Sequence, residues 1–382
     1  MIAQCRAAVA LLVLALSLGA AAQAADLIVE KKTFELASYA TVGGGTIKNV
    51  KIGWEAAGTL NADKSNAILI THFFSGTSHA FGKYAPGDAA AGYWDAIVGP
   101  GKAIDTDKYY VLSSDTLVNL NVKAPNVVTT GPASIDPDTG KPYGLRFPVV
   151  NIKDFVNVQK ALVESLGIKK LKMVMGASMG ALQAFEWAAS YPDMVDRVIT
   201  VIGAPAADPF LIGWLDLWAE PIRVDPKWNN GDYYDKEPPL AGLTAALKIL
   251  TLHANHWDWA ASSQGGWAEE GKDPNKSLAN KFKIEATLEA AAAARAKTAD
   301  ANHFIYLARA NQLASADSRR MKAPTLVLYT PTDLVFYAPF VESAAARISA
   351  AQTGTITGPN GHLNGVLAIT QATDKISAFL AR

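Results

Sequence analysis

The sequence has a single cysteine, Cys5, which lies close to the start of its 382 residues. The chain beyond it therefore has no disulfide, no thiol nucleophile and no thiolate metal site. An excess of one charge is also absent, because 35 Lys and Arg residues balance 35 Asp and Glu residues. Nucleic-acid-binding proteins typically carry a basic excess, so we expect no nucleic-acid partner.

Long apolar runs are scarce, and one lies at the N-terminus. The run "AAVALLVLALSLGAAAQA" ends in Ala22-Gln23-Ala24, which matches the small-x-small pattern of a signal-peptidase site. Its apolar core, from Ala7 to Leu18, is shorter than the roughly 20 residues of a membrane-spanning helix. A membrane anchor is the alternative. We expect residues 1–24 to be a signal peptide, the protein to be periplasmic or secreted, and no stable membrane span to remain after cleavage.

The rest of the chain alternates short apolar runs with helical patterns. Two extended segments, Thr33–Tyr39 and Thr46–Ala56, flank a turn, "VGGGT", which lacks the Lys-Ser/Thr ending of a phosphate-binding loop. Six apolar runs follow, at Asn66–His72, Tyr109–Asp115, Leu171–Gly176, Asp196–Gly203, Ala323–Thr330 and Gln352–Gly358. Such runs are typical of strands buried in a parallel sheet. Helical spacing in residues 151–167 adds to the evidence for an α/β fold.

The strand pattern stops between Gly203 and Met321. This stretch holds six of the nine tryptophans and an alanine-rich helical segment, Lys283–Thr298. We interpret residues 204–320 as a helical lid inserted between two parts of an α/β core, residues 25–203 and 321–382. Most of the lid aromatics are expected to pack in the lid, and one or two to line a pocket beneath it.

Ser178 lies in the motif "GASMG", residues 176–180. An isolated G-x-S-x-G is weak evidence, but here a predicted strand, Leu171–Met175, precedes it and a predicted helix, Met179–Ser190, follows it. Strand, sharp turn and helix form the nucleophile elbow that exposes a reactive serine. Ser178 is therefore a candidate nucleophile, and an ordinary strand–helix loop is the alternative.

A serine nucleophile needs a base, and the base needs an orienting acid. In this architecture the chain order is Ser, then Asp or Glu, then His. His362, in "GPNGHLNG", follows the last predicted strand, and Asp333 follows the strand before it, whereas Asp317 precedes that strand. We predict Ser178, Asp333 and His362 as a catalytic triad; the alternatives are an exposed loop histidine and a turn aspartate.

The oxyanion hole of such a site uses two backbone N–H groups. One belongs to the residue after the serine, Met179. The other comes from the loop "FFSGTSH" after the first buried strand, where we favour Phe74 and keep Phe73 as the alternative.

Two histidines of the lid, His253 and His256, have a spacing that could suit a metal. A metal site needs at least three placed ligands, and no third ligand has a clear position. We therefore expect these residues to pack within the lid, and we expect neither a metal nor a cofactor.

These motifs resemble the homoserine O-acetyltransferase family, a branch of the α/β-hydrolases, over most of the chain. The matching blocks are "GPASIDPDTGKPYGLRFPVVNIKDFVNVQKALVESLGIKKL", "GASMGALQAFEWAASYPDMVDRVI", "DPKWNNGDYY", "ANHFIYLARANQ" and "GHLNG". The resemblance implies an α/β-hydrolase fold, with a mostly parallel sheet flanked by helices and a helical lid insertion. It also implies Ser178, Asp333 and His362 as the triad of a ping-pong acyl transfer from an ester or thioester.

The sequence departs from the family where an amino-acid acceptor would bind. Ala219 stands where family members carry a carboxylate-binding arginine, and Arg223 lies four residues later. Leu363 replaces the aspartate that follows the family histidine, and "AKTADAN" lacks a further arginine. Each hydrogen bond to a charged group contributes roughly 1.5–3 kcal/mol, so losing two would remove about 3–6 kcal/mol of acceptor binding.

The sequence therefore favours a serine ester hydrolase that passes the acyl group of a small-molecule ester or thioester to water. The alternatives are an O-acyltransferase with a different, less charged acceptor, and a non-catalytic binding protein that uses the lid pocket. The sequence leaves the oligomeric state open, with a homodimer among the alternatives.

Overall fold

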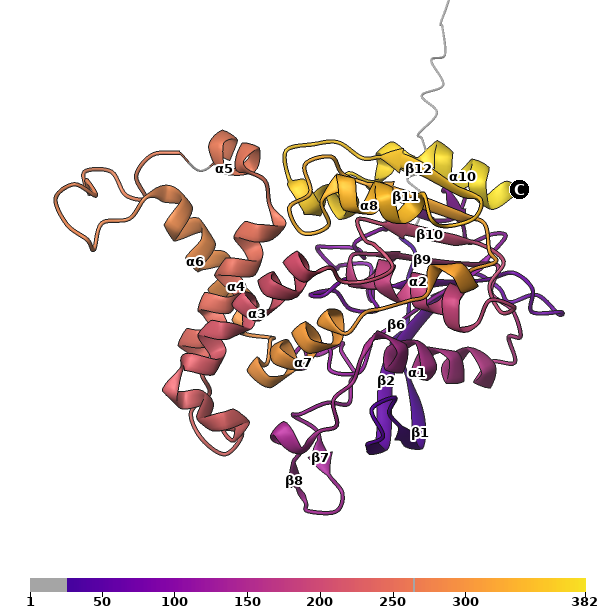
Figure 1. The fold of residues 1–382 in the computed structure, drawn as a ribbon, viewed down its shortest axis with the longest axis horizontal. Coiled ribbons are helices and arrows are strands. Elements are labelled where there is room, and N and C mark those ends of the chain that lie inside the picture. The colour runs from indigo at the N-terminus through magenta and orange to yellow at the C-terminus, as the bar shows by residue number, and fades with distance from the viewer. Residues whose placement is uncertain (1–25, 264) are drawn as a thin grey trace, which may run out of the picture.

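The computed structural model describes residues 26–263 and 265–382, and its centre is an eight-stranded sheet (Figure 1). The leader predicted at residues 1–24 lies outside the described residues. The strand order is β1-β2-β6-β3-β9-β10-β11-β12. The strands are β1 Lys32–Ala40, β2 Thr46–Ala57, β3 Ala67–Thr71, β6 Tyr110–Ser114, β9 Met173–Ala177, β10 Val198–Val201, β11 Thr325–Tyr329 and β12 Ala351–Thr355.

Most of this sheet is parallel. Strands β1 and β2 form an antiparallel hairpin, β2 also pairs antiparallel with β6, and the strands from β6 to β12 all run parallel. The sequence-based prediction of a mostly parallel α/β sheet is thus confirmed. Strands β3 and β9 are buried along their whole length, as their unbroken apolar runs predict.

Helices cover both faces of the sheet. One face packs against α1 Ile152–Ser165, α2 Met179–Ser190 and α8 Ala338–Ala345. The other face packs against α10 Thr373–Ala381 and the loop segment 80–104. Helix α1 begins with a capping box between Asn151 and Asp154, which satisfies backbone donors at the helix start.

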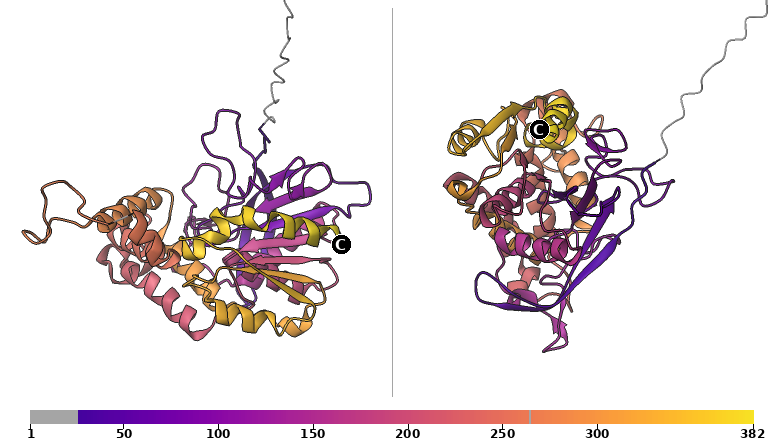
Figure 2. Two further views of the ribbon diagram at one scale, coloured as in Figure 1. Left: turned by 90° about the horizontal axis from the view of Figure 1, so that it is seen from above. Right: turned by 90° about the vertical axis from the view of Figure 1, so that its right-hand side faces the viewer.

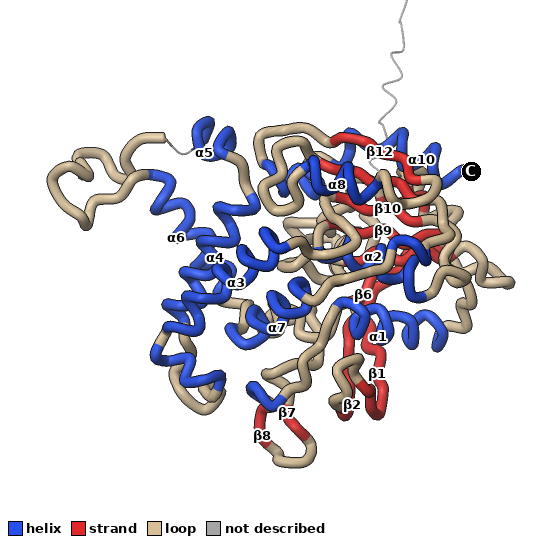
Figure 3. The backbone as a smooth tube through the Cα atoms, in the orientation of Figure 1, coloured by secondary structure: helices blue, strands red, loops and turns tan. Residues whose placement is uncertain are grey.

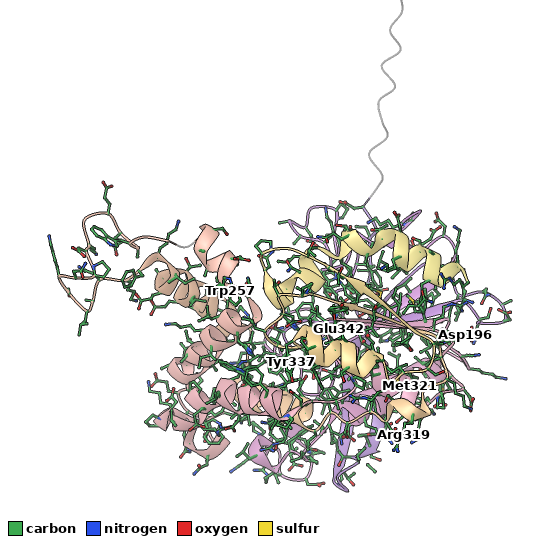
Figure 4. The ribbon with its side chains drawn as sticks, turned by 45° about the horizontal axis from the view of Figure 1, so that its top comes forward. Asp196, Trp257, Arg319, Met321, Tyr337 and Glu342 are labelled. Carbon is green, nitrogen blue, oxygen red and sulfur yellow. The ribbon has the colours of Figure 1, made fainter. Side chains whose placement is uncertain are left out.

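The segment between β10 and β11 forms a helical lid beside the sheet (Figures 2 and 3). Its helices are α3 Pro209–Val224, α4 Leu240–Ala254, α5 Trp257–Ser263, α6 Lys283–Ala296 and α7 Ala301–Gln312. Helix α4 packs against α3 and α6, and α7 packs against α3. Figure 4 shows Tyr337 where the lid meets the rest of the chain; its hydroxyl donates a hydrogen bond to Asp208, which caps α3, at 2.6 Å.

Several short elements were not predicted from the sequence. They are β4 Val98–Gly99, β5 Ile104–Asp105, β7 Ile135–Asp136, β8 Lys141–Pro142 and α9 Asn364–Leu367, with the 3-10 turns η1 Gly144–Arg146, η2 Pro226–Gly231, η3 Ser318–Arg320, η4 Gly361–Leu363 and η5 Ile369–Ala372. In the part of the chain that the structure describes, no helix has the length and apolar character to cross a bilayer.

Candidate active site

Ser178 occupies the sharp turn between β9 and α2. Its backbone has φ 56° and ψ −118°, a conformation that costs a non-glycine residue about 1–3 kcal/mol. Such strain is typical of a nucleophile elbow, where the serine is held out of both the strand and the helix. The Ser178 side chain therefore stands at the carboxyl end of the parallel strands, next to the first turn of α2.

The two glycines that flank this turn are required by close backbone approaches. A Cβ atom on Gly176 would lie 2.1 Å from Thr71 Oγ1 and 2.3 Å from the carbonyl oxygen of Gly180. A Cβ atom on Gly180 would lie 2.1 Å from the carbonyl oxygen of Thr71. Both distances are far below van der Waals contact, so the G-x-S-x-G pattern lets α2 pack directly against the end of β3.

The three side chains singled out from the sequence lie together, hydrogen-bonded in series. His362 Nε2 lies 2.8 Å from Ser178 Oγ, and His362 Nδ1 lies 2.8 Å from Asp333 Oδ2. All three residues are buried, with 3–9% of their surface exposed. A carboxylate on Nδ1 fixes the imidazole with its proton on that nitrogen, which leaves Nε2 free to accept a proton from Ser178.

The acid is fixed by its own loop. Asp333 follows β11, and its Oδ1 accepts hydrogen bonds from the backbone N–H groups of Val335 at 2.7 Å and Phe336 at 2.9 Å. The Phe336 ring stacks near the imidazole of His362, with 6.0 Å between ring centroids. Asp317 lies in an exposed ion pair with Arg319 before β11, as its place in the sequence implies.

The loop after β3 carries the predicted second oxyanion donor. Phe73 and Phe74 both line the cavity that contains Ser178. Among the described residues, no hydrogen bond uses the backbone N–H of Phe74 or of Met179, so both donors are available. Side-chain amides of Asn121 and Asn119 bind the carbonyl oxygens of residues 75 and 76, at 3.0 and 3.1 Å, which holds the loop in place.

A cluster of buried charged side chains binds the end of the same loop. Lys31 Nζ lies 2.9 Å from Glu55 Oε1 and 3.3 Å from Asp115 Oδ2, and both carboxylates are fully buried. Ser78 and His79, at the end of the loop, bind Glu55 at 2.8 and 3.0 Å. Burial alone would raise the pKa of Glu55, but the hydrogen bond to His79 and the charge of Lys31 lower it to about 2.

The cavity at Ser178 is small and largely apolar. Its volume is about 40 Å³, and at roughly 10–15 Å³ for each enclosed water it has room for roughly three water-sized groups. Its lining comes from the loop after β3, the elbow, the lid and the histidine loop: Phe73, Phe74, Ser75, Ser178, Ile202, Trp218, Leu250, Ala254, His362, Leu363 and Val366.

The lid supplies three of these lining residues, Trp218, Leu250 and Ala254. The sequence places one or two lid aromatics at a pocket but does not single out Trp218, because it does not show which face of a lid helix meets Ser178. The signal that distinguishes Trp218 is three-dimensional: α3 packs against α4, and one face of each helix lines the cavity at Ser178.

The positions at which the sequence departs from the acetyltransferase pattern lie in different surroundings. Ala219 is buried in α3. Arg223 is bound on the surface by Asp216 at 2.7 Å and by Glu220 at 2.6 Å, and it does not line the cavity. Leu363 lines the cavity directly beside His362. Among described residues, those that line the cavity include no Lys, Arg, Asp or Glu.

The two lid histidines do not share a helix face. Helix α4 ends at Ala254, so His253 lies on the helix and His256 lies beyond it. His253 binds Trp218 and a backbone carbonyl, whereas His256 lies 3.0 Å from Asp258. Across residues 26–263 and 265–382, no group of three His, Cys, Asp or Glu residues is arranged to hold a metal ion.

Comparison with known proteins identifies the family. The alpha/beta hydrolase fold family matches residues 125–365. The chain is 33% identical to the homoserine O-acetyltransferase of Carboxydothermus hydrogenoformans over 367 residues, which cover 92% of this chain and 95% of that protein. The crystal structure of esterase E22 matches with a TM-score of 0.89 and 48% identity, over 92% of this chain and 100% of that chain.

In other curated relatives, the region similar to this chain is only part of a longer protein. The homoserine O-acetyltransferase of Methanococcoides burtonii is 39% identical over 270 residues, which cover 70% of this chain but only 54% of that protein. The chain thus spans about half the length of this relative. On the strength of the full-length match and the family match, the chain belongs to the homoserine O-acetyltransferase-like branch of the alpha/beta hydrolase family.

Proposed function

We propose that this protein is a serine-dependent ester hydrolase that acts on a small ester or thioester through an acyl-enzyme intermediate. The observation that carries the proposal is the hydrogen-bonded series from Ser178 through His362 to Asp333, which opens on a small apolar cavity. Both an esterase and homoserine O-acetyltransferases are among the relatives, and acylation of Ser178 is compatible with either ester hydrolysis or acyl transfer.

The first half of the reaction acylates Ser178. His362 Nε2 takes the proton of Ser178 Oγ as this oxygen attacks the substrate carbonyl, and Asp333 stabilises the resulting imidazolium. The backbone N–H groups of Phe74 and Met179 stabilise the negative oxygen of the tetrahedral intermediate; one such donor typically contributes a factor of about 10²–10³ in rate. The imidazolium then gives its proton to the departing alcohol or thiol, which leaves the acyl group on Ser178.

Deacylation by water follows the same path with the same groups. His362 removes a proton from a water molecule, which attacks the ester carbonyl of the acyl-enzyme. The carboxylic acid leaves, and the proton returns to Ser178 Oγ. The cavity has room for roughly three water-sized groups, which favours an acetyl-sized or slightly larger acyl group.

Water is favoured over homoserine because the cavity offers no charged partner to an amino acid. A free ammonium and carboxylate would each lose hydration on entering it, which is costly without a paired charge. Arg223 is engaged by Asp216 and Glu220 on the surface, and Leu363 is apolar. Homoserine would therefore bind weakly and compete poorly with water.

A second candidate is transfer to an uncharged alcohol. The apolar wall formed by Leu363, Val366 and Trp218 would suit an alcohol with a small hydrocarbon group. This acceptor would have to exclude water from the acyl-enzyme, so transfer product would exceed free acid whenever the alcohol is present.

We also propose that the protein is exported to the periplasm or secreted, on the basis of the leader-like residues 1–24. Association into a homodimer is supported by the outer face of α3 and α4, where Leu217, Val224 and Leu252 are exposed beside an apolar groove. Exposed apolar surface of this kind often marks an interaction site. Light scattering of the wild type and of Leu217→Glu would test this association.

The test of the main proposal combines a rate with product analysis. Purified protein lacking residues 1–24 is supplied with p-nitrophenyl acetate, with and without homoserine or short alcohols, and free acetate and acetylated acceptor are quantified. We expect acetate to dominate and Ser178→Ala to lose about 10⁶ in turnover. An unchanged rate in Ser178→Ala would refute the assignment, and a dominant acetylated alcohol would favour the second candidate.

A further inference from the structure

His253 is a buried lid residue that the acyl-transfer steps do not use. It lies in the last turn of α4 and is 7% exposed. Its imidazole lies between Trp218 of α3, which lines the cavity, and Leu334, which directly follows Asp333. One side chain thus contacts both the wall of the cavity and the loop of the predicted acid.

The two ring nitrogens of His253 have different partners. Trp218 Nε1–H donates a hydrogen bond to Nδ1 at 3.1 Å, and Nε2 lies 2.9 Å from the carbonyl oxygen of Leu334. An indole N–H only donates and a carbonyl only accepts, so Nδ1 must be unprotonated and Nε2 must carry the proton. The ring is therefore held as a single neutral tautomer, and its burial lowers the pKa of His253 to about 4.

Aromatic contacts extend this arrangement on both sides. The Trp214 ring stacks on the outer face of the imidazole, with 4.1 Å between centroids. The Trp218 ring packs edge-to-face against Phe74, at 5.6 Å. Phe74 carries the predicted oxyanion donor, so Trp218 contacts both His253, which does not line the cavity, and the oxyanion loop, which does.

We propose that His253 is a positioning residue with two separable roles. Through Nδ1 it holds the Trp218 indole in the wall of the cavity, and this sets the longest acyl group that fits. Through Nε2 it holds the carbonyl of Leu334, and this keeps Asp333 aligned with His362. The inference rests on the proposed ester hydrolysis and adds the residue that limits its acyl chain.

Two substitutions separate the roles, because each amide side chain reproduces one nitrogen. In His253→Gln, the terminal amide can still donate to Leu334, but nothing accepts from Trp218. In His253→Asn, the side-chain oxygen can accept from Trp218, but no donor reaches Leu334. Trp218→Phe removes the indole donor and keeps an aromatic ring in the wall.

The assay is hydrolysis of p-nitrophenyl acetate and hexanoate, with kcat and KM determined for each. We expect His253→Gln and Trp218→Phe each to raise the hexanoate-to-acetate ratio of kcat/KM about fivefold, the factor that corresponds to one neutral hydrogen bond, with no further rise in the double variant. We expect His253→Asn to keep this ratio and to lower kcat about fivefold. Trp228→Phe is the matched control, because its indole binds Asn302 at 2.9 Å within the lid but away from the cavity.

Equal losses in both histidine variants, or additive effects of His253→Gln and Trp218→Phe, would overturn the proposal. A second measurement needs neither a variant nor activity. The ¹⁵N chemical shifts of the imidazoles in the wild type at neutral pH should show one ring with Nε2 protonated and Nδ1 unprotonated. Its Nε2 proton should give NMR cross-peaks to Leu334, which identifies the ring as that of His253. The opposite tautomer, or a fast-exchanging average, would contradict the geometry, whereas lack of esterase activity with the expected tautomer would count against the proposed function alone.

Discussion

The size of the acyl cavity leads to a prediction about Leu250. This side chain lines the cavity from α4 and is 6% exposed. Leu250→Ala removes three carbon atoms from the wall and makes room for up to about three acyl methylenes. Each methylene that becomes buried contributes about 0.8 kcal/mol, so three contribute about 2.4 kcal/mol. The ratio of kcat/KM for hexanoate over acetate should then rise by up to about 60-fold, because each 1.36 kcal/mol is tenfold.

The assay compares p-nitrophenyl esters of two to eight carbons in the wild type and in Leu250→Ala. Leu247→Ala is the matched control, because Leu247 lies one turn earlier on α4, is fully buried and does not line the cavity. Both substitutions should lower the free energy of unfolding by about 2–5 kcal/mol, so only a change confined to Leu250→Ala reports on the cavity. An identical dependence of kcat/KM on acyl chain length in the two variants would refute the assignment of Leu250 to the wall of the cavity at Ser178.

Three further predictions concern the acid, the elbow and the buried charges. Asp333→Asn should lower kcat by about 10³–10⁴ with little change in folding, because His362 would adopt the wrong tautomer; a small loss in steady-state kinetics would exclude the acid role. Gly180→Ala places a methyl group 2.1 Å from the carbonyl oxygen of Thr71 and should destabilise by about 1–3 kcal/mol in urea unfolding; unchanged stability would contradict the close packing. The folded-state pKa of Glu55 is lowered from 4.5 to about 2, so its stabilising contribution is present above about pH 4.5 and is lost as the pH falls from about 4.5 to about 2. The thermal midpoint of Glu55→Gln should therefore fall less steeply with decreasing pH than that of the wild type, and equal pH dependences would contradict this role of Glu55.

Much of the core could be predicted because its signals are local. Each buried strand is a short apolar run. The elbow is a contiguous motif, and its glycines are required where the backbone is closely approached by neighbouring atoms. The order of Ser178, Asp333 and His362 along the chain follows from the order of the strands in an α/β sheet. The structure places these side chains at hydrogen-bonding distance, as that order implies.

The lid could not be predicted to the same depth because its contacts are not local. The role of Trp218 depends on how α3 packs against α4, and nothing in its own sequence surroundings distinguishes it from Trp214 on the same helix. The contact of His253 with Leu334 joins residues 81 positions apart. The three-residue spacing of His253 and His256 could suit a metal on a helix, but α4 ends at Ala254, which the sequence does not show.

The proposed mechanism requires that Ser178 carries the acyl group during turnover. The most direct measurement is peptide mass spectrometry of the protein quenched in acid during steady-state hydrolysis of p-nitrophenyl acetate. We predict an acetyl group on the peptide that contains Ser178, its loss when substrate is exhausted, and its absence in Ser178→Ala. Turnover with no acetylated Ser178 peptide, or acetylation of another residue at the catalytic rate, would contradict the account.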